Sequence, residues 1–235
     1  MKFPGNPEGK KALINEFVAS NLCEVLDLPI LKYSLIEVSL DNYKPGMDSD
    51  LVLISGTSFG TIYNDRILNV LNAGQVGNTV NKNDAIKIII FDLLIGNNDR
   101  NKGNLMIDSN RNKLIMIDHT HIFELETIWD DIQLNLRCDD KFDVSKLNQY
   151  NYKNLFESIK YTSDFYNELN SFIIKVKSIK KEEIERIIDN IPKDWNITEK
   201  EKISLTNYIY KRFCRVDEIL EILNLKGGDI NEFQS

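Results

Sequence analysis

Residues 95–104 read Ile-Gly-Asn-Asn-Asp-Arg-Asn-Lys-Gly-Asn. The segments on either side of this stretch indicate how the chain folds around it. A run of ten mostly apolar residues, 85–94, comes directly before it. Its hydrophobic side chains lie almost all round a helix, which is typical of a buried helix. We therefore expect a central helix that ends in a polar loop carrying Asp99 and Asn104.

Two short apolar segments follow the loop. Residues 104–107 and 114–117 predict a pair of strands, and the Asp, Ser and Asn residues between them favour a hairpin turn. The second strand ends at Asp118. The hairpin is therefore expected to return Asp118 to the neighbourhood of the loop.

Asp99, Asn104 and Asp118 are the side-chain types that phosphoryl transfer requires. That reaction needs a carboxylate that orients or deprotonates the attacking hydroxyl, and oxygen ligands for the magnesium ions on the phosphates. We expect Asp99 to be the catalytic base and Asn104 and Asp118 to bind the metal, in the order of kinase-like catalytic segments. The alternative is a structural turn, because Gly, Asn and Asp are common in turns. The placement of Asp118 at a strand end favours the catalytic interpretation.

The composition restricts the class of protein. The chain has 235 residues, of which 42% are hydrophobic, so it can form one large domain or two packed lobes. Its net charge of -7 argues against general binding to nucleic acids or anionic membranes. The three cysteines (Cys23, Cys138 and Cys214) have no metal-binding spacing, and no apolar run resembles a signal peptide or a membrane span. A cytoplasmic protein is expected.

The first sixty residues predict a small mixed unit. Residues 1–3 can end a strand, and helical periodicity runs over 10–28 until a proline stops it. Residues 30–40 and 51–55 are rich in β-branched and apolar side chains and predict strands. The glycines and hydroxyl residues of 56–60 predict a mobile connection.

Several of these segments resemble the HipA-like kinase family. They are Lys2-Phe3-Pro4, Asn15-Glu16-Phe17, Leu26-Asp27-Leu28-Pro29, the 95–104 loop with Asp118, and residues 183–195. The similarity extends over nearly the whole chain. The Asp-Arg-x-x-x-Asn spacing of the loop is shared with phosphoinositide-type kinases, whereas the N-terminal segments favour the HipA-like group.

The resemblance implies a fold, a reaction and its cofactors. The fold is α+β, a two-lobed protein-kinase-like fold with a reduced N-terminal β lobe (1–56) and a mainly helical C-terminal lobe (57–235). The reaction is transfer of the γ-phosphoryl group of ATP, with Mg²⁺, to a protein serine or threonine. Some family members are toxins paired with a DNA-binding antitoxin, so a toxin-antitoxin role is a further implication.

The resemblance also assigns roles to individual residues. Lys2 is the strand lysine that contacts the nucleotide phosphates, and Glu16 is the helix glutamate that pairs with it. Arg100 belongs to the catalytic loop, where it braces the loop more readily than it meets substrate. From the residues alone, Lys2 is a chain end that would fray and Glu16 is a solvated helix charge.

Two departures from the family pattern leave alternatives open. A Gly-rich loop normally precedes the lysine, and the sequence begins one residue before Lys2. A partner polypeptide can supply the missing strands, the sequence can be a fragment, or the protein can be an inactive nucleotide-binding or interaction module. Asn101 stands where the commoner motif has His, and a neutral amide is not a proton donor of the same kind. A lipid or small-molecule kinase is a third functional class.

The remaining chain predicts mainly helices. We expect a helix over 63–73, a polar loop over 75–83, and helices over 144–177, 181–191 and 198–225. Thr198 and Glu201 have the spacing of a capping box within the last of these.

His119 and His121 form a His-x-His pair. Such a pair can bind zinc or copper, but the sequence contains no third histidine, so we expect a structural role.

Overall fold

The computed structural model describes residues 1–39, 54–62, 65–101, 103–148 and 150–225. The strands within these described residues are β1 (Tyr33–Val38), β2 (Gly56–Thr61), β3 (Ile67–Asn69), β4 (Leu105–Asp108) and β5 (Lys113–Met116). The helices are α1 (Lys10–Val25), α2 (Ala73–Gly77), α3 (Asp84–Ile95), α4 (Asp131–Arg137), α5 (Tyr150–Ser158), α6 (Ser163–Ser178), α7 (Lys181–Asp189), α8 (Glu199–Cys214) and α9 (Val216–Ile222). The described part also contains the 3₁₀ turns η2 (Ser145–Asn148) and η3 (Lys193–Trp195). The predicted α+β class is confirmed.

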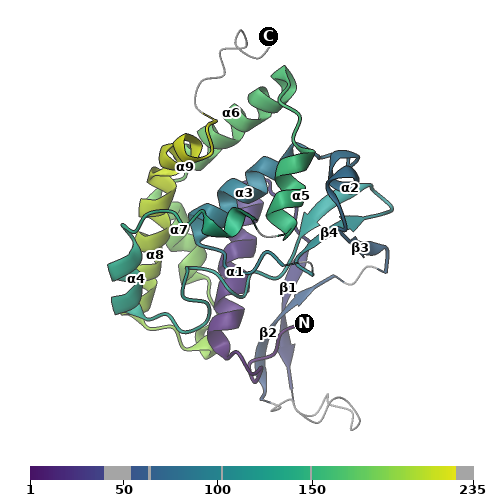
Figure 1. The fold of residues 1–235 in the computed structure, drawn as a ribbon. Coiled ribbons are helices and arrows are strands. Elements are labelled where there is room, and N and C mark those ends of the chain that lie inside the picture. Colours follow the sequence, from purple (N-terminus) through teal and green to yellow (C-terminus); the bar gives the residue numbers. More distant parts are fainter. Residues whose placement is uncertain (40–53, 63–64, 102, 149, 226–235) are drawn as a thin grey trace.

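Strands β1 and β2 form an antiparallel ribbon, paired from Tyr33 with Thr61 to Val38 with Gly56. In Figure 1 the ribbon extends away from the helical body, and the N-terminus lies beside it. Lys2 makes an isolated antiparallel bridge to Phe59 of β2. The expected strand at residues 1–3 is therefore a single bridged residue.

The expectation of a mobile connection over 56–60 is wrong, because these residues form β2. Thr57, Ser58 and Phe59 are all buried. Small side chains look like a linker in the sequence, but here they allow the strand to lie close to the rest of the protein. Of the predicted strand over 51–55, residues 51–53 lie outside the described part, and Ile54 and Ser55 are not in a strand.

Strands β3, β4 and β5 form a second antiparallel sheet, in that order. The predicted hairpin is confirmed: β4 and β5 pair from Leu105 with Met116 to Asp108 with Lys113. The predicted helix over 63–73 is wrong, because Ile67–Asn69 is β3 and pairs with β4. Its apolar residues match a helical period, but hydrogen bonding to the free edge of β4 outweighs that local preference.

Part of the expected loop over 75–83 is also helical. Helix α2 begins after Asn72, whose side chain accepts a hydrogen bond from the backbone N–H of Gln75. Such a cap stabilises the first turn of a helix.

The C-terminal helices largely follow the sequence pattern. The capping box is present at the start of α8, where the Thr198 and Glu201 side chains each bond the other's backbone N–H. The predicted helix over 198–225 is divided at Arg215 into α8 and α9. No described helix combines the length and apolar character that a membrane crossing requires.

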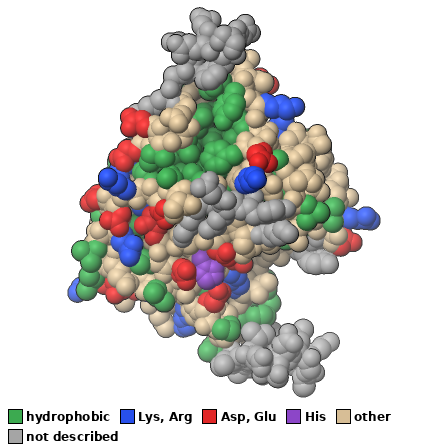
Figure 2. Space-filling model, in the orientation of Figure 1, with side chains coloured by type: hydrophobic (Ala, Val, Ile, Leu, Met, Phe, Trp, Pro, Cys, Tyr) green, Lys and Arg blue, Asp and Glu red, His purple; other side chains and the backbone are tan. Residues whose placement is uncertain are grey.

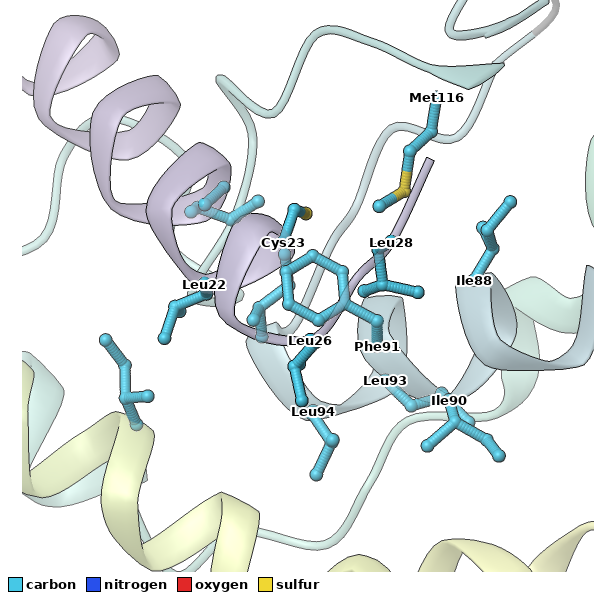
Figure 3. Close-up of a cluster of buried hydrophobic side chains, with 14 of the residues drawn as sticks. Leu22, Cys23, Leu26, Leu28, Ile88, Ile90, Phe91, Leu93, Leu94 and Met116 are labelled. Atoms are coloured by element: carbon cyan, nitrogen blue, oxygen red, sulfur yellow. The ribbon is translucent and has the colours of Figure 1, made fainter. Parts of the chain in front are cut away.

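Helices α1 and α3 occupy the centre of the hydrophobic core. Figure 3 shows residues of both helices meeting around the ring of Phe91, with Leu28 and Met116 close by. Lys87 alone among the residues of α3 is not buried. A helix held on all sides is a rigid platform for the loop that follows it.

Candidate active site

The loop after α3 begins with a sharp turn. Gly96 adopts the left-handed conformation, with φ 63°, and ends the helix. The Asn97 side chain then donates a 2.9 Å hydrogen bond to Asp92 of the same helix. The turn ends α3, and the hydrogen bond anchors the start of the loop to the helix.

Arg100 braces this loop from inside. Its side chain is fully buried, and it forms a two-pronged ion pair with Asp92, at 2.9 Å from Nε and 2.8 Å from Nη2. Its Nη1 donates to the carbonyl oxygens of Asn104 and Ile117, at 2.7 Å and 3.0 Å. Burial opposes both charges, but their mutual attraction raises the pKa of Arg100 and lowers that of Asp92. Arg100 thus lies behind the loop and connects it to Asp92 of α3 and to Ile117.

Helix α5 supplies two further supports for the loop. The Tyr152 hydroxyl donates a 3.1 Å hydrogen bond to Asp92, and the Asn151 amide donates to the carbonyl oxygen of Asn101. Both residues are buried. The sequence provides no signal for this contact, because α5 lies fifty residues away and only the fold brings it to the loop.

Asp99 and Asn104 are directly connected. The Asn104 amide nitrogen donates to the backbone oxygen of Asp99 at 2.6 Å and to its carboxylate at 3.1 Å. The Asn101 amide donates to both carboxylate oxygens of Asp99, at 2.8 and 2.9 Å. Asn101, which departs from the commoner family motif, thus fixes the orientation of the Asp99 carboxylate.

The hairpin brings Asp118 to the same region. The Ile117 N–H donates a 3.2 Å hydrogen bond to the carbonyl oxygen of Asn104, so Asp118 follows a residue that is paired with the loop. Asp118 has φ 55°, a left-handed conformation that is unfavourable for a non-glycine residue. Such conformations often occur at functional sites, but seven other described non-glycine residues also have positive φ.

Lys2 joins two carboxylates from distant parts of the chain. Its ammonium nitrogen lies 2.9 Å from Glu16 on α1 and 2.8 Å from Asp118. Burial lowers the pKa of Lys2, but the two carboxylates outweigh it and raise the pKa above its ordinary value. Burial likewise disfavours a charged Asp118, but Lys2 and the Thr120 hydroxyl hold its pKa well below the usual range. Lys2 and Asp118 are therefore charged at neutral pH, and Lys2 is not frayed.

Glu16 lies on α1 and forms an ion pair with Lys2. It is buried, and burial raises its pKa in spite of the attraction of Lys2. The backbone N–H of His119 donates to it at 3.1 Å, and the Thr120 hydroxyl, which donates to Asp118, lies 3.2 Å from it. A buried carboxylate held by Lys2 and a backbone N–H is a fixed support for Lys2 and differs from a solvated helix charge.

Thr120 and His119 are site residues that sequence reasoning did not single out for this role. The Thr120 hydroxyl donates to Asp118 at 2.7 Å, and the Lys2 ammonium donates to Thr120. His119 is buried, and burial together with the nearby Arg100 charge lowers its pKa to about 3. The sequence contains one signal for the Thr120 contact. A Thr hydroxyl two residues after an Asp can form a local hydrogen bond with it.

In the described part of the chain, no group of three or more His, Cys, Asp or Glu side chains is placed so that it could hold a metal ion, and this includes the His-x-His pair. The His119 ring lies 3.2 Å from the Arg100 guanidinium, whereas His121 lies 3.1 Å from Glu8 and 3.7 Å from Glu126. Figure 2 shows acidic side chains around the visible histidine, with basic side chains beside them.

A cavity of about 190 Å³ lies beside the Lys2 cluster. Its polar lining includes Lys2, Glu16 and Asp118, and its apolar lining includes Met1, Ile30, Leu31, Phe59, Met116 and Ile117. It is smaller than the roughly 300–1,000 Å³ of a typical ligand pocket, so it would take only part of a nucleotide.

The sequence model of the HipA-like kinase family matches residues 4–224. The chain belongs to the HipA-like kinase family. The resemblance noted in the sequence is therefore confirmed.

Comparison with solved structures supports the fold of this HipA-like kinase. The crystal structure of a Helicobacter pylori proinflammatory kinase, CtkA, is similar, with a TM-score of 0.55 and 16% sequence identity. The match covers 92% of this chain and 82% of that chain. At this identity the likeness concerns the fold, and it confirms the predicted kinase-like architecture. No curated protein has a significantly similar sequence.

Membership of a kinase family implies a nucleoside triphosphate and a divalent metal in general, and the residues present fit both. Asn104 Oδ1 and the Asp118 carboxylate are hard oxygen donors, and magnesium typically takes one or two carboxylates and keeps several waters. The Lys2 ammonium, which lines the cavity, is a compact positive charge of the kind that binds a phosphate group. A metal held there would neutralise phosphate charge.

Proposed function

We propose that this HipA-like kinase transfers the γ-phosphoryl group of ATP to a serine or threonine hydroxyl of a protein. The observation that supports this most is that the loop after α3, Asp118 and Lys2 are joined by hydrogen bonds. The loop with Asp99 and Asn104 is hydrogen-bonded to Ile117, the residue before Asp118, and Asp118 is hydrogen-bonded to Lys2.

In this proposal Asp99 orients the acceptor hydroxyl and takes its proton. The hydroxyl oxygen bonds to the γ-phosphorus, the bond from that phosphorus to the bridging oxygen breaks, and ADP leaves. Lys2, steadied by Glu16, neutralises phosphate charge, and Asn104 and Asp118 would hold Mg²⁺. Arg100 keeps the loop in shape and does not meet the substrate, because it is fully buried.

The other expectations about the biological role stay predictions. They are a protein substrate, a partner polypeptide that supplies a Gly-rich loop, a toxin-antitoxin role and a cytoplasmic location. The acceptor class is a separate question from the fold, since similar catalytic centres act on different acceptors.

The function is tested with purified protein, Mg²⁺ and γ-labelled ATP. Casein serves as a general protein acceptor and phosphatidylinositol vesicles as a lipid acceptor, and mass spectrometry locates the phosphate. Label on serine or threonine supports the proposal. Label on lipid alone points to a lipid kinase, and ATP binding without any transfer or hydrolysis points to an inactive module.

Two variants separate the assigned roles. Asp99→Asn should lower turnover by about 10²–10⁴-fold while ATP affinity is kept, because general-base catalysis contributes that much. Asp118→Ala should instead abolish magnesium-dependent ATP binding. Asp164→Asn, the same chemical change on the exposed first turn of α6, is the matched control and should leave both unchanged. Full binding by Asp118→Ala would contradict the metal assignment.

A further inference from the structure

Strand β2 has an outer edge that faces away from β1. In an antiparallel ribbon the outward N–H and C=O groups belong to alternate residues, here Thr57, Phe59 and Thr61. Unpaired groups at such an edge let the strand fray or pair wrongly. The groups that hydrogen-bond to this edge therefore fix the position of β2 relative to the rest of the protein.

Two of these outward residues, Thr57 and Phe59, are bound by different parts of the chain. At Phe59, the N–H donates to the Lys2 carbonyl oxygen at 3.0 Å and the C=O accepts from the Lys2 N–H at 2.7 Å. At Thr57, the N–H donates to the Asp194 carboxylate and the C=O accepts from the Trp195 indole N–H, both at 2.7 Å. Lys2 and the 3₁₀ turn η3 thus occupy neighbouring positions along one strand edge.

Asp194 holds Thr57 by its side chain as well. The Thr57 hydroxyl lies 3.0 Å from the second carboxylate oxygen of Asp194 and 2.9 Å from Glu37 of β1. The Asp194 carbonyl oxygen in turn accepts a 2.5 Å hydrogen bond from Lys10 at the start of α1. Turn η3 is therefore tied to both β2 and α1.

Trp195 extends this connection to the helix that carries Glu16. Its side chain is buried, and its ring meets that of Phe17 edge to face, with centroids 6.0 Å apart. Phe17 is the chain neighbour of Glu16. Trp195 therefore contacts both elements that position the Lys2 ammonium, namely the strand that pairs with its backbone and the helix that provides its carboxylate.

Gly56 shows how closely the turn approaches the strand. It has φ 146°, and a Cβ atom there would lie 2.7 Å from the Asp194 carboxylate oxygen. Any side chain at this position would have to displace Asp194. The glycine permits the Asp194 contact with Thr57.

We propose that Asp194 and Trp195 are positioning residues for Lys2, and that through them the C-terminal helical part sets the affinity of the site for nucleotide phosphates. Thr57 and Phe59 are two residues apart in one strand, so the strand edge transmits the position of η3 to Lys2. The proposal rests on the proposed function only for the role of Lys2 toward the phosphates. The placement of Lys2 itself can be measured without a nucleotide.

The first experiment measures that placement by competitive acetylation with acetic anhydride and mass spectrometry. Trp195→Phe keeps a ring against Phe17 but removes the N–H, and Asp194→Ala removes the carboxylate from an exposed residue, so at least one variant is expected to fold. Lys2 should acetylate severalfold faster in both, because it loses its carboxylate neighbours. Lys200, which is exposed on α8, provides the internal reference, and Lys193→Ala in the same turn is the matched control. Unchanged Lys2 reactivity in Trp195→Phe and Asp194→Ala would overturn the proposal.

The second experiment titrates ADP with Mg²⁺ and, separately, adenosine. Each variant should weaken ADP binding about three- to tenfold, the effect of losing one hydrogen bond, and leave adenosine binding unchanged. Added to Lys2→Met, Trp195→Phe should have no further effect, because both changes act on one interaction. Equal loss of adenosine and ADP affinity would indicate a general structural effect and overturn the proposal. If Lys2→Met alone leaves ADP affinity unchanged, the phosphate role of Lys2 in the proposed function fails, and the acetylation result still decides the positioning role.

Discussion

At the residue scale, the candidate site is a network of charged side chains that are stabilised by ion pairs and hydrogen bonds with one another. Lys2 lies within 3 Å of Glu16 and Asp118, and His119 lies in contact with Arg100. Partly buried charges interact more strongly than exposed ones because solvent screens them less. The protonation states of these side chains therefore influence stability as well as chemistry.

His119 should make the folded protein sensitive to mild acid. Its pKa is lowered to about 3, below its ordinary 6.5, by burial and by the Arg100 charge. Between these two values the unfolded chain takes up a proton that the folded chain refuses, so stability falls as pH falls below about 6.5. The contribution is at most about 1.4 kcal/mol per pH unit. Urea unfolding from pH 7.5 to pH 5 measures it.

A pair of histidine variants isolates this effect. His119→Gln, which keeps an acceptor for Arg100 and cannot be protonated, should flatten the pH dependence. His121→Gln, at the less buried histidine, should keep it. An equal slope in wild type and His119→Gln would refute the assignment.

At the element scale, the loop after α3 depends on one buried ion pair. We expect Arg100→Ala to lower the free energy of unfolding by about 3–5 kcal/mol, because Asp92 would stay buried without its partner. Denaturant unfolding followed by circular dichroism measures the change. The matched control is Arg111→Ala, whose side chain is 80% exposed and lies 3.9 Å from Asp108. Such a surface pair should contribute about 0–1 kcal/mol, and similar losses in the two variants would contradict the bracing role.

The end of α3 depends on Gly96 in a different way. An added Cβ would lie 2.6 Å from the Glu124 side chain and 2.9 Å from its backbone nitrogen, and φ is 63°. Gly96→Ala should therefore destabilise the protein by about 2–5 kcal/mol, the sum of backbone strain and overpacking. Gly9→Ala, also at positive φ but with no atom within 4 Å of the added Cβ, should cost only about 1–2 kcal/mol. Thermal unfolding measures both variants. An equal fall in the melting temperature would show that Glu124 can move away from the added Cβ at little cost in stability.

At the scale of the whole molecule, one hydrophobic core links the elements that carry the site. Residues of α1, β2, α3, β4, β5 and the C-terminal helices belong to the same buried cluster. A ligand that binds the site should therefore stabilise the whole fold, because it binds only when these elements are together.

We expect saturating ATP with Mg²⁺ to raise the melting temperature. At a hundredfold excess over the dissociation constant, the stabilisation is about 2.7 kcal/mol, which corresponds to about 5–11 °C for a chain of this size. Differential scanning calorimetry measures it. Asp99→Asn should keep the shift and Asp118→Ala should lose it. A shift in Asp118→Ala as large as in wild type would argue against metal-assisted binding.

Part of the fold was predictable because the pattern is local. The ten apolar residues before the loop, the hairpin and the Thr198–Glu201 capping box each depend on residues a few positions apart. The strand β2 and the strand β3 were missed, since both depend on pairing with distant segments. The side chains of 56–60 and 63–73 looked like a linker and a helix because their partners are not visible in the local sequence.

The sequence by itself determined the family and the order of Asp99, Asn104 and Asp118 along one loop and hairpin, because their spacing is encoded within 24 consecutive residues. Only the tertiary structure decided that Lys2 is held by Glu16 and Asp118, that Arg100 lies behind the loop, and that Trp195 binds the edge of β2. These contacts join residues between 8 and 138 positions apart. They form only when burial of the shared core brings the segments together, and no local preference specifies them.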